Sequence, residues 1–498
     1  MKTRKNYKIF DTSSLTHDIK GKSIRGGSSL LAGQGASIIL RIGTTAILAR
    51  LLMPEQFGLV YMVTAFTGFA QIFKDLGLSD ATIQKKDITH DEVSNLFWIN
   101  ASLGILTMIF IASMSSIVAW FYGDIRLRNI TLVISISFLF SGLTVQHQAL
   151  LYRQMQLGKL ALINIISVFL GSVIGIILAW KGFNYWALVW KEIFTNIFIA
   201  SGVWLICPWL PGLPKRHANI RPLLSFGRDL TGKNILGYIS RRIDKILIGR
   251  LNGAISLGLY EKATQLMVLP MQQIRTPLVR VAMPALSALQ NDNKKYLEYY
   301  KKLNELFAFI YMPMVVYLGL FSENVIRLIL GEKWLGTVVI FRILAFASFI
   351  FPVSSLCDVV LITRGMTKRY FIWGMVDAFF IISCYVIGVN WGAVGVATAF
   401  TIGKYMLFYP SIWYRLKGTN VPIDTPFKSV YLAAFSSLLM GLILFFISKY
   451  FIFKSNILII AISLLFSCII YLGIWWVIPS CRQKLKEYYS LPRLLFKR

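Results

Sequence analysis

Residues 221–290 read RPLLSFGRDLTGKNILGYISRRIDKILIGRLNGAISLGLYEKATQLMVLPMQQIRTPLVRVAMPALSALQ, and this stretch decides the fold. It holds two apolar runs of about 20 residues, the length that crosses a bilayer, at roughly 225–249 and 256–283. Charged residues interrupt both runs: Arg228, Asp229, Lys233, Arg241, Arg242, Asp244, Lys245, Glu261, Lys262, Arg275 and Arg280. Each charge near a span centre costs about 2.5–3.5 kcal/mol, whereas a Leu or Ile contributes only about 0.5. We therefore expect these side chains to avoid lipid.

At about 100° per residue, the polar residues of each run fall on one face of a helix. In the first run these are Asp229, Lys233, Arg241, Asp244 and Lys245, and in the second Glu261, Gln265, Gln272, Arg275 and Thr276. The pattern predicts a protein-lined, mainly cationic cavity. Two alternatives stay open: the basic side chains reach the lipid headgroups as topology signals, or Arg241 pairs with Asp244 within its own helix.

Composition places the chain among polytopic membrane proteins, because 56% of its 498 residues are hydrophobic and 15% are charged. A soluble core is excluded. The net charge of +30 does not indicate nucleic acid binding, because the basic residues concentrate in alternate loops and the tails. Those segments hold about 31 Lys and Arg, against about 9 in the other loops. This asymmetry predicts that both termini are cytoplasmic.

Chemistry-bearing residues form no recognisable catalytic or metal motif. The five cysteines and four histidines are scattered, which suggests neither a disulfide framework nor a metal site, and we expect no cofactor. Residues 1–27 lack the apolar core and cleavage site of a signal peptide, so we interpret them as a retained cytoplasmic arm.

The apolar runs predict an all-α polytopic membrane protein with about 14 transmembrane helices. The predicted spans are 30–52, 57–79, 94–120, 130–150, 160–180, 183–206, 225–249, 256–283, 299–321, 335–362, 370–389, 392–413, 428–448 and 456–478. Pro270, Pro277 and Pro284 recur every seven residues in the eighth span, where they allow either a static kink or a hinge.

A weak internal repeat divides the spans into two six-helix lobes. At an offset of 200 residues, Ile39, Arg41, Arg50, Leu51, Gly58, Leu59 and Thr64 recur as Ile239, Arg241, Arg250, Leu251, Gly258, Leu259 and Thr264. Six intervening spans would relate the lobes by a pseudo-two-fold axis along the membrane normal. The predicted parts are the arm 1–27, the N-lobe 28–207, a proline-rich cytoplasmic linker 208–222, the C-lobe 223–421, helices 13 and 14 in 422–480, and a cytoplasmic tail 481–498.

Further polar residues lie within other predicted spans. Gln34, Arg41 and Thr45 share a face of the first helix, and Thr64, Thr67, Gln71 and Asp75 share a face of the second. Lys191, Glu192 and Asn196 lie in the sixth, Arg342 and Asp358 in the tenth, and Asp377 in the eleventh. For each, a polar contact between helices and a transport role stay open.

Several segments carry a family resemblance. They are RLLMPEQFGLV (50–60), FKDLGLSDATIQKKD (73–87), LFWINASLG (96–104), FYGDIRL (121–127), LIGRLNG (247–253) and PALSALQ (284–290). In them the chain resembles the polysaccharide-exporting flippases of the multidrug/oligosaccharidyl-lipid/polysaccharide superfamily, in particular exporters of colanic and teichuronic acid type. The resemblance covers roughly residues 28–420. Lys245 departs from the family pattern, which more often has an uncharged amide there.

The resemblance implies transfer of an undecaprenyl-diphosphate-linked oligosaccharide to the outer leaflet of a bacterial inner membrane, by two lobes that open as a V. Arginine forks bind phosphate oxygens in two-point geometry. Arg41, Arg241, Arg242 and Arg275 are accordingly the candidate ligands of the diphosphate. Candidate ion-coupling or cavity acids are Asp75, Asp244, Glu261, Glu192 and Asp358. Membrane lipid and a polysaccharide polymerase are the expected partners.

Two other functions compete with export. A drug/cation antiporter of the same fold should show a cavity dominated by carboxylates, whereas arginines exceed acids here. A membrane glycosyltransferase or polysaccharide polymerase usually needs a sizeable extracytoplasmic loop, and the corresponding loops here are short. The sequence also shows no paired carboxylates and no nucleophile beside a base, so an enzyme is not expected.

Overall fold

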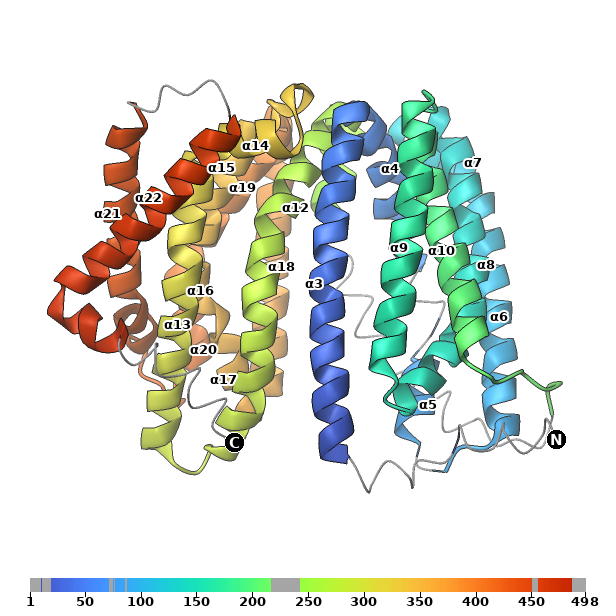
Figure 1. Ribbon diagram of the computed structural model, residues 1–498, viewed down its shortest axis with the longest axis horizontal. Helices are drawn as coiled ribbons and strands as arrows, with labels where there is room; N and C mark the ends of the chain where they lie inside the picture. The colour runs from blue at the N-terminus through green and yellow to red at the C-terminus, as the bar shows by residue number, and fades with distance from the viewer. Residues whose placement is uncertain are drawn as a thin grey trace. The chain divides into compact units, whose positions relative to one another are not determined.

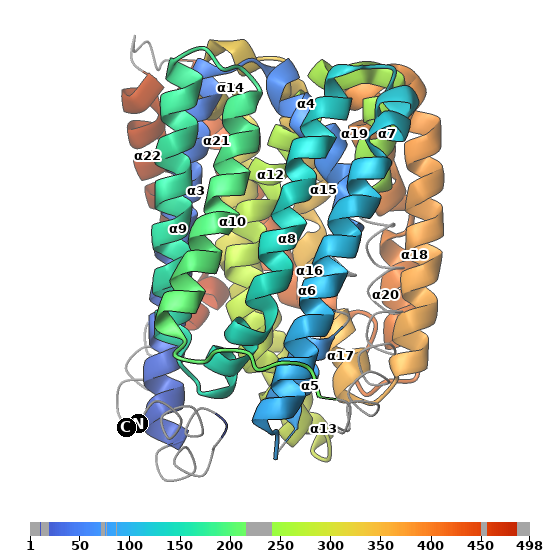
Figure 2. The ribbon, with the colours of Figure 1, turned by 90° about the vertical axis from the view of Figure 1, so that its right-hand side faces the viewer.

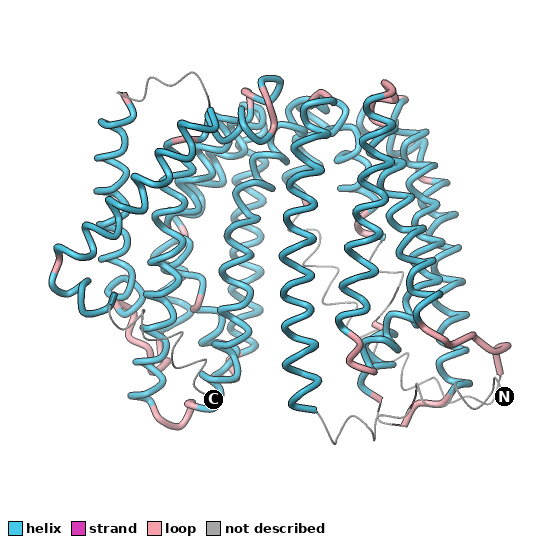
Figure 3. The backbone as a smooth tube through the Cα atoms, viewed as in Figure 1, coloured by secondary structure: helices cyan, strands magenta, loops and turns pink. Residues whose placement is uncertain are grey.

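The computed structural model is built of α-helices connected by short loops (Figure 3). It describes residues 10, 19–70, 75, 77–85, 87–215, 242–449 and 456–485, and within these ranges no residue is in a β-strand. The chain forms two compact units, Met1–Gly258 and Leu259–Arg498. An all-helical fold is what the long apolar runs predict, since a helix satisfies its own backbone hydrogen bonds in lipid.

Four long helices of the first unit lie side by side in an order that differs from their order in the chain. Figure 2 shows α9, α10, α8 and α6 side by side in that order, and α3 packs against α9 (Figure 1). The bounds are α3 Ile19–Leu51, α4 Pro54–Thr67, α5 Leu78–Gln84, α6 His90–Ser113, α7 Ser115–Tyr122, α8 Arg126–Arg153, α9 Leu157–Trp180 and α10 Trp186–Ile206. Trp209, just after α10, is almost completely buried against the end of this bundle.

In the second unit, α13 packs against α21 and α15, and α18 packs against α19. The bounds are α12 Ile243–Ala288, which begins in the first unit, α13 Asn293–Leu320, α14 Ser322–Ile329, α15 Thr337–Phe349, α16 Phe351–Ser355, α17 Cys357–Thr363, α18 Thr367–Gly388, α19 Gly392–Met406, α20 Phe408–Leu416, α21 Thr425–Ser448 and α22 Asn456–Val477. Short 3-10 turns, Glu332–Trp334 and Val389–Trp391, connect α14 to α15 and α18 to α19.

Eight helices of the described chain are long and apolar enough to cross a membrane, or up to nine if the bent pair Thr337–Phe349 and Phe351–Thr363 is one span. Some of the 14 predicted spans differ for physical reasons. The second, predicted at 57–79, corresponds to α4, whose 14 residues end at Thr67 before Gly68 and are too few to cross a bilayer. The eighth lies in α12, whose charges lower its hydropathy. The count of 14 therefore stays a prediction.

Alternate loops of each unit lie at the same end of their bundle, as alternating spans require. In the first unit, Gln56 Nε2 donates to Asn184 Oδ1 at 2.9 Å at one end. Lys215 Nζ pairs with Asp91 Oδ2 at 2.9 Å at the other. The second unit has the same grouping, with Asn324 hydrogen-bonded to Asn456, and Arg364 to Asn293.

The predicted break between the seventh and eighth spans is confirmed at Gly253, which has φ 81° and ψ 179° inside α12. This left-handed φ favours glycine. The helix continues through Pro270, Pro277 and Pro284. Residues 216–241, which hold the end of the predicted linker and most of the seventh span, lie outside the described residues, so the domain boundaries stay predictions.

Within the first unit, two segments of the sequence repeat cross at their backbones. A Cβ added at Gly58 would lie 1.8 Å from the carbonyl oxygen of Ala254. One added at Gly258 would lie 2.2 Å from that of Pro54. The contacts are reciprocal at the offset of 200 residues, since 58 meets 254 and 54 meets 258. Only glycine fits at either crossing position.

Candidate functional site

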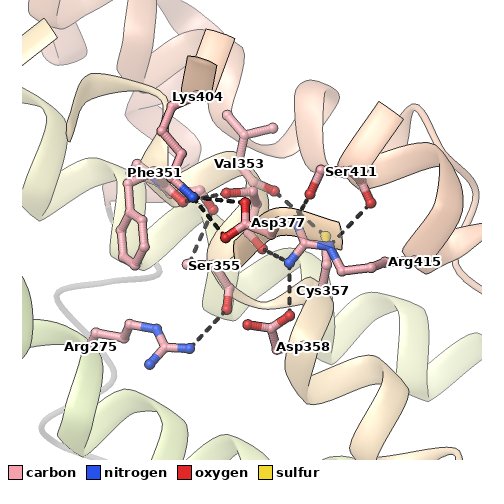
Figure 4. A network of polar contacts seen from close by, with 12 residues as sticks. Arg275, Phe351, Val353, Ser355, Cys357, Asp358, Asp377, Lys404, Ser411 and Arg415 are labelled. Carbon is pink, nitrogen blue, oxygen red and sulfur yellow. Dashed lines mark hydrogen bonds and ion pairs between the residues drawn. The ribbon is translucent and has the colours of Figure 1, made fainter. Parts of the chain in front are cut away.

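An ion pair between a buried arginine and a partly exposed aspartate forms the centre of a polar cluster in the second unit (Figure 4). Arg415 of α20 is 6% exposed, and its Nη1 lies 2.8 Å from Asp358 Oδ1 of α17. Arg415 Nε donates to the Ser411 carbonyl at 3.1 Å, and Nη2 donates to the Ser411 hydroxyl. The guanidinium is thus fully engaged with protein groups, which is the condition under which a charge is tolerated in an apolar interior.

The same cluster satisfies the backbone of a broken helix. Between α15 and α16 the chain bends by 51° at Ile350, and Pro352, in the first turn of α16, has no N–H for the helical hydrogen-bond ladder. A second interruption, at Leu356, separates α16 from α17. The Ser354 carbonyl accepts from Arg415 Nη1 at 3.2 Å, and the Ser355 carbonyl accepts from Arg275 Nη2 at 3.3 Å. Two arginines therefore brace the break, which explains how irregular backbone is accommodated at this depth.

Arg275 is less completely paired than Arg415. Its guanidinium lies 5.9 Å from the centroid of the Phe351 ring, and its side chain points toward Ser355 in Figure 4. Arg275 Nε is buried and has no hydrogen-bond partner among the described residues. No carboxylate of the described chain pairs with it. Arg275 thus keeps donors free for an anionic ligand.

A second ion pair joins α18 and α19. Lys404 Nζ lies 2.8 and 3.0 Å from the two carboxylate oxygens of Asp377 (Figure 4). About a third of each side chain is exposed. Asp358 is paired with Arg415, so both acids of this cluster are neutralised by neighbouring bases. The remaining net positive charge of the cluster is that of Arg275.

The polar residues at the beginning of α12 are drawn partly into the protein. Asp244 is 6% exposed and Lys262 is 2% exposed, while Glu261 and Arg242 are half-buried. Lys262 Nζ donates to Gln265 Oε1 at 3.4 Å. Arg241 lies outside the described residues. Gln265, Gln272 and Thr276 are exposed. These residues of the predicted polar face are therefore accessible to a ligand.

In the first unit, Arg41 of α3 and Glu192 of α10 are exposed, and both lie close enough to Lys191 to influence its charge. Asp75 is different. Its carboxylate accepts from the Ser79 N–H at 2.8 Å and from the Ser79 hydroxyl, which secures the start of the short α5. The structure thus gives Asp75 a capping role.

A chain of neutral side chains runs through the interior of the first unit. Gln146 Nε2 donates to Asn100 Oδ1 at 2.8 Å, and Thr82 Oγ1 lies 2.8 Å from Gln146 Oε1. All three residues are fully buried. At the end of α5, Arg153 Nη1 donates to the Thr82 carbonyl at 3.1 Å and to that of Lys85 at 2.5 Å, satisfying carbonyls that the short helix leaves open.

Sequence reasoning missed Arg415, Lys404, Asn100 and Gln146 as members of these networks. Arg415 and Asp358 are 57 positions apart, and Gln146 and Asn100 are 46 apart. No helical period links such positions. The one available signal was that a lone acid within a span needs a basic partner. No group of three or more potential metal ligands occurs among the residues the structure describes.

Comparisons with known proteins are consistent with this architecture. A family model described as "Polysaccharide biosynthesis protein" matches residues 47–339. The chain is 25% identical to the lipopolysaccharide biosynthesis protein WzxC of Escherichia coli (strain K12), over 73% of this chain and 75% of that protein. It is 26% identical to the teichuronic acid biosynthesis protein TuaB of Bacillus subtilis (strain 168), over 82% and 86%.

Among solved structures, the fold is similar to that of the lipid II flippase MurJ in an inward closed conformation. The TM-score is 0.72 at 16% identity, covering 90% of this chain and 98% of that one. An inward-facing multidrug resistance transporter of the MATE family superposes with a TM-score of 0.60 at 14% identity, over 78% and 95%. At these identities the similarity establishes the fold, one used by membrane transporters.

Proposed function

Because the chain belongs to the polysaccharide biosynthesis protein family, we propose that it moves undecaprenyl-diphosphate-linked oligosaccharides from the cytoplasmic to the outer leaflet of a bacterial inner membrane. It is a multi-pass membrane transporter and not an enzyme. The relatives that carry the names of lipopolysaccharide and teichuronic acid biosynthesis support a lipid-linked glycan as the substrate. Membrane lipid surrounds the transporter, and a polysaccharide polymerase is its proposed partner.

Arg275 is the observation that carries the proposal. It is a half-buried cation in the middle of α12, held by a neutral carbonyl and an aromatic ring, with a buried Nε that has no partner among the described residues. The neighbouring acids already have basic partners. A drug/cation antiporter would need acids free to bind a cation, whereas this arrangement favours an anionic group such as a diphosphate.

Arg41, Arg241 and Arg242 are the proposed companions of Arg275 in holding the diphosphate. Asp244, Glu261, Glu192 and Asp358 are proposed to tune the charge of the cavity or to couple ion movement to transport. If Asp358 couples ion movement to transport, its ion pair with Arg415 has to break during the cycle.

Alternating access between two related halves is the proposed mechanism, with a pseudo-two-fold axis along the membrane normal. The reciprocal contacts of Gly58 with Ala254 and of Gly258 with Pro54 support it, because positions related by a two-fold axis contact each other in this pairwise way. Both termini are proposed to be cytoplasmic. In a cysteine-free background, a cysteine at position 217 should resist labelling from outside intact cells, and labelling there would contradict this orientation.

Export by arginine variants tests the diphosphate site. Arg275→Ala removes a charge-assisted contact worth about 1.5–3 kcal/mol, which corresponds to roughly tenfold to a hundredfold in affinity. Arg275→Lys keeps the charge without the fork and should restore export only partly. The same pairs of variants apply at positions 41 and 241, with the abundance of each protein in the membrane measured in parallel.

Arg280, exposed on the same helix, provides the matched control, and Arg280→Lys should export normally. Normal export by all three Ala variants at wild-type abundance would contradict the cationic site. Complete rescue by Lys at every position would instead identify these residues as headgroup anchors.

A further inference from the structure

Lys191 lies within a span, and its ammonium has no protein partner among the described residues. It is the sixth residue of α10, a helix long and apolar enough to cross the membrane, and its side chain is half-buried. No hydrogen bond or ion pair connects its ammonium to any residue of the described ranges. Its backbone carbonyl accepts from Thr195 Oγ1 at 2.7 Å. Its charged neighbours are Arg41 and Glu192. An unpaired ammonium at such a position is costly and is a sign of function.

Close packing against α9 fixes where Lys191 lies. A Cβ added at Gly175 would lie 2.8 Å from the Lys191 Cβ, and one added at Gly171 would lie 3.0 Å from the Lys191 carbonyl oxygen. These two glycines, one helical turn apart, let the two helices approach closely, as small residues do in membranes. The first carbons of the Lys191 side chain therefore lie against α9.

Arg41 lies at a similar depth on the other neighbour of α9. The helices α3 and α9 touch where a Cβ added at Gly33 would lie 2.6 Å from the Ala161 Cβ. The segments that follow α3 and α9 are joined by the hydrogen bond between Gln56 and Asn184. Both helices therefore end at the same end of the unit and run parallel. Arg41, eight residues after Gly33, is then level with about residue 169 of α9, which is less than two turns from Gly175.

A hydroxyl without a partner lies between these levels. Ser172 of α9 is 3% exposed, and its Oγ has no hydrogen-bond partner among the described residues. Figure 1 shows α9 between α3 and α10, in agreement with the packing of both helices on it. Two cations and a free hydroxyl are therefore contributed by three adjacent helices.

Glu192 offsets only part of this positive charge. It lies close enough to Lys191 to influence its charge but forms no ion pair with it, because the two side chains project about 100° apart around α10. Two bases and one acid leave a net positive charge. Phosphate oxygens meet the requirement, because they accept from an arginine fork, an ammonium and a hydroxyl together.

We infer that Lys191, together with Arg41 and Ser172, forms a phosphate-binding subsite within the first unit, and that Lys191 contacts the phosphate directly. This inference rests on the proposed function for the identity of the ligand, a lipid-linked diphosphate. The subsite itself requires only a phosphate, which a lipid headgroup or a free anion supplies equally well.

The test measures binding of undecaprenyl diphosphate, inorganic pyrophosphate and undecaprenol to the purified full-length protein in nanodiscs. Lys191→Met keeps the length and packing of the side chain and removes its charge. It should weaken binding of the diphosphate lipid about tenfold or more. Lys191→Arg should retain most of that binding. Undecaprenol, which lacks phosphate, should not respond to either variant.

Lys85→Met is the matched control, because Lys85 is a lysine of the same unit that is paired with Glu92 and lies outside both proposed phosphate sites. It should lower the melting temperature while leaving the diphosphate affinity unchanged. Lys191→Met should leave the melting temperature without ligand unchanged or raise it, since it removes an unpaired charge. A lower melting temperature together with an affinity within twofold of wild type would overturn the inference and identify Lys191 as structural or as a headgroup anchor.

The two proposals fail in different ways. Pyrophosphate binding that depends on Lys191, without binding of the diphosphate lipid, would uphold the subsite and contradict a lipid-linked substrate. Binding of the diphosphate lipid that depends on Arg275 and not on Lys191 would uphold the proposed function and overturn the subsite.

Discussion

The two units satisfy polar groups in their apolar interiors by different means. In the first unit, Asn100, Gln146 and Thr82 form a neutral hydrogen-bonded chain. In the second, the central contact is the charged pair of Arg415 and Asp358. Neutral groups cost less to bury, whereas a buried ion pair depends on both partners being present. The first unit should therefore tolerate single changes to its network better than the second.

The largest effect is expected from breaking the buried pair. Arg415→Ala removes a buried guanidinium, the partner of the Asp358 carboxylate and the donor of the Ser354 carbonyl. The expected cost is about 3 kcal/mol, at the lower end of the range for a buried pair, because Asp358 is partly exposed to solvent. The melting temperature of the purified protein in detergent should fall accordingly. The double variant Arg415→Met with Asp358→Asn should recover much of the loss, because no lone charge remains. A double variant as unstable as Arg415→Ala would show that packing, and not charge, dominates here.

A smaller effect is expected from the neutral chain. Gln146→Leu leaves the buried polar atoms of Asn100 and Thr82 without this partner, which should cost about 1–3 kcal/mol. The same melting measurement compares it directly with Arg415→Ala. If Gln146→Leu were the more destabilising of the two, the distinction between the units would be wrong.

A pair that is partly exposed should behave more mildly than Arg415 and Asp358 within the same unit. The two acids are similarly exposed, but the Lys404 side chain is 32% exposed whereas that of Arg415 is 7% exposed. Lys404→Met therefore removes fewer buried contacts, and the expected cost is about 1 kcal/mol. Asp377→Asn should have a similar effect. A loss equal to that of Arg415→Ala would indicate that burial does not control the strength of these pairs.

The smallest effect is expected at the end of the first unit, in the loop before α8. There the hydrogen bond from Arg126 holds the pKa of the Asp124 carboxyl below its usual value. A lowered pKa means that the stabilisation is present above the unfolded pKa of about 3.9 and is lost as the pH falls through the lower folded value. Asp124→Asn should cost less than about 1 kcal/mol at neutral pH.

The pH dependence of that difference provides the check. Melting temperatures of the wild type and Asp124→Asn should differ by a constant amount between about pH 5 and 7 and converge below about pH 4. A difference that persists undiminished in acid would show that the carboxylate charge does not contribute. Since the mutation leaves Glu55 paired with Arg126, it tests a single contact of this cluster.

Sequence alone determined the class of the protein and much of its helical layout. Long apolar runs can only be buried in lipid as helices, and the glycine of LNG breaks α12 in the gap between the two apolar runs predicted at 225–249 and 256–283. Charged residues within predicted spans, such as Arg275 and Asp358, were also recognisable from sequence as residues that must face protein. Each of these conclusions follows from a local property, namely hydropathy, helical period or backbone preference.

Only the tertiary structure decided which of those charged residues are already satisfied. Asp358 pairs with a base 57 positions away and Asp75 caps a short helix, whereas the Lys191 ammonium pairs with no group in the described chain. Helical periodicity tells which face a residue occupies, but the partner on the facing helix depends on how helices distant in sequence pack. An arginine that is paired and one that is not look the same in the sequence. Only the tertiary structure therefore shows which of them is available to a ligand.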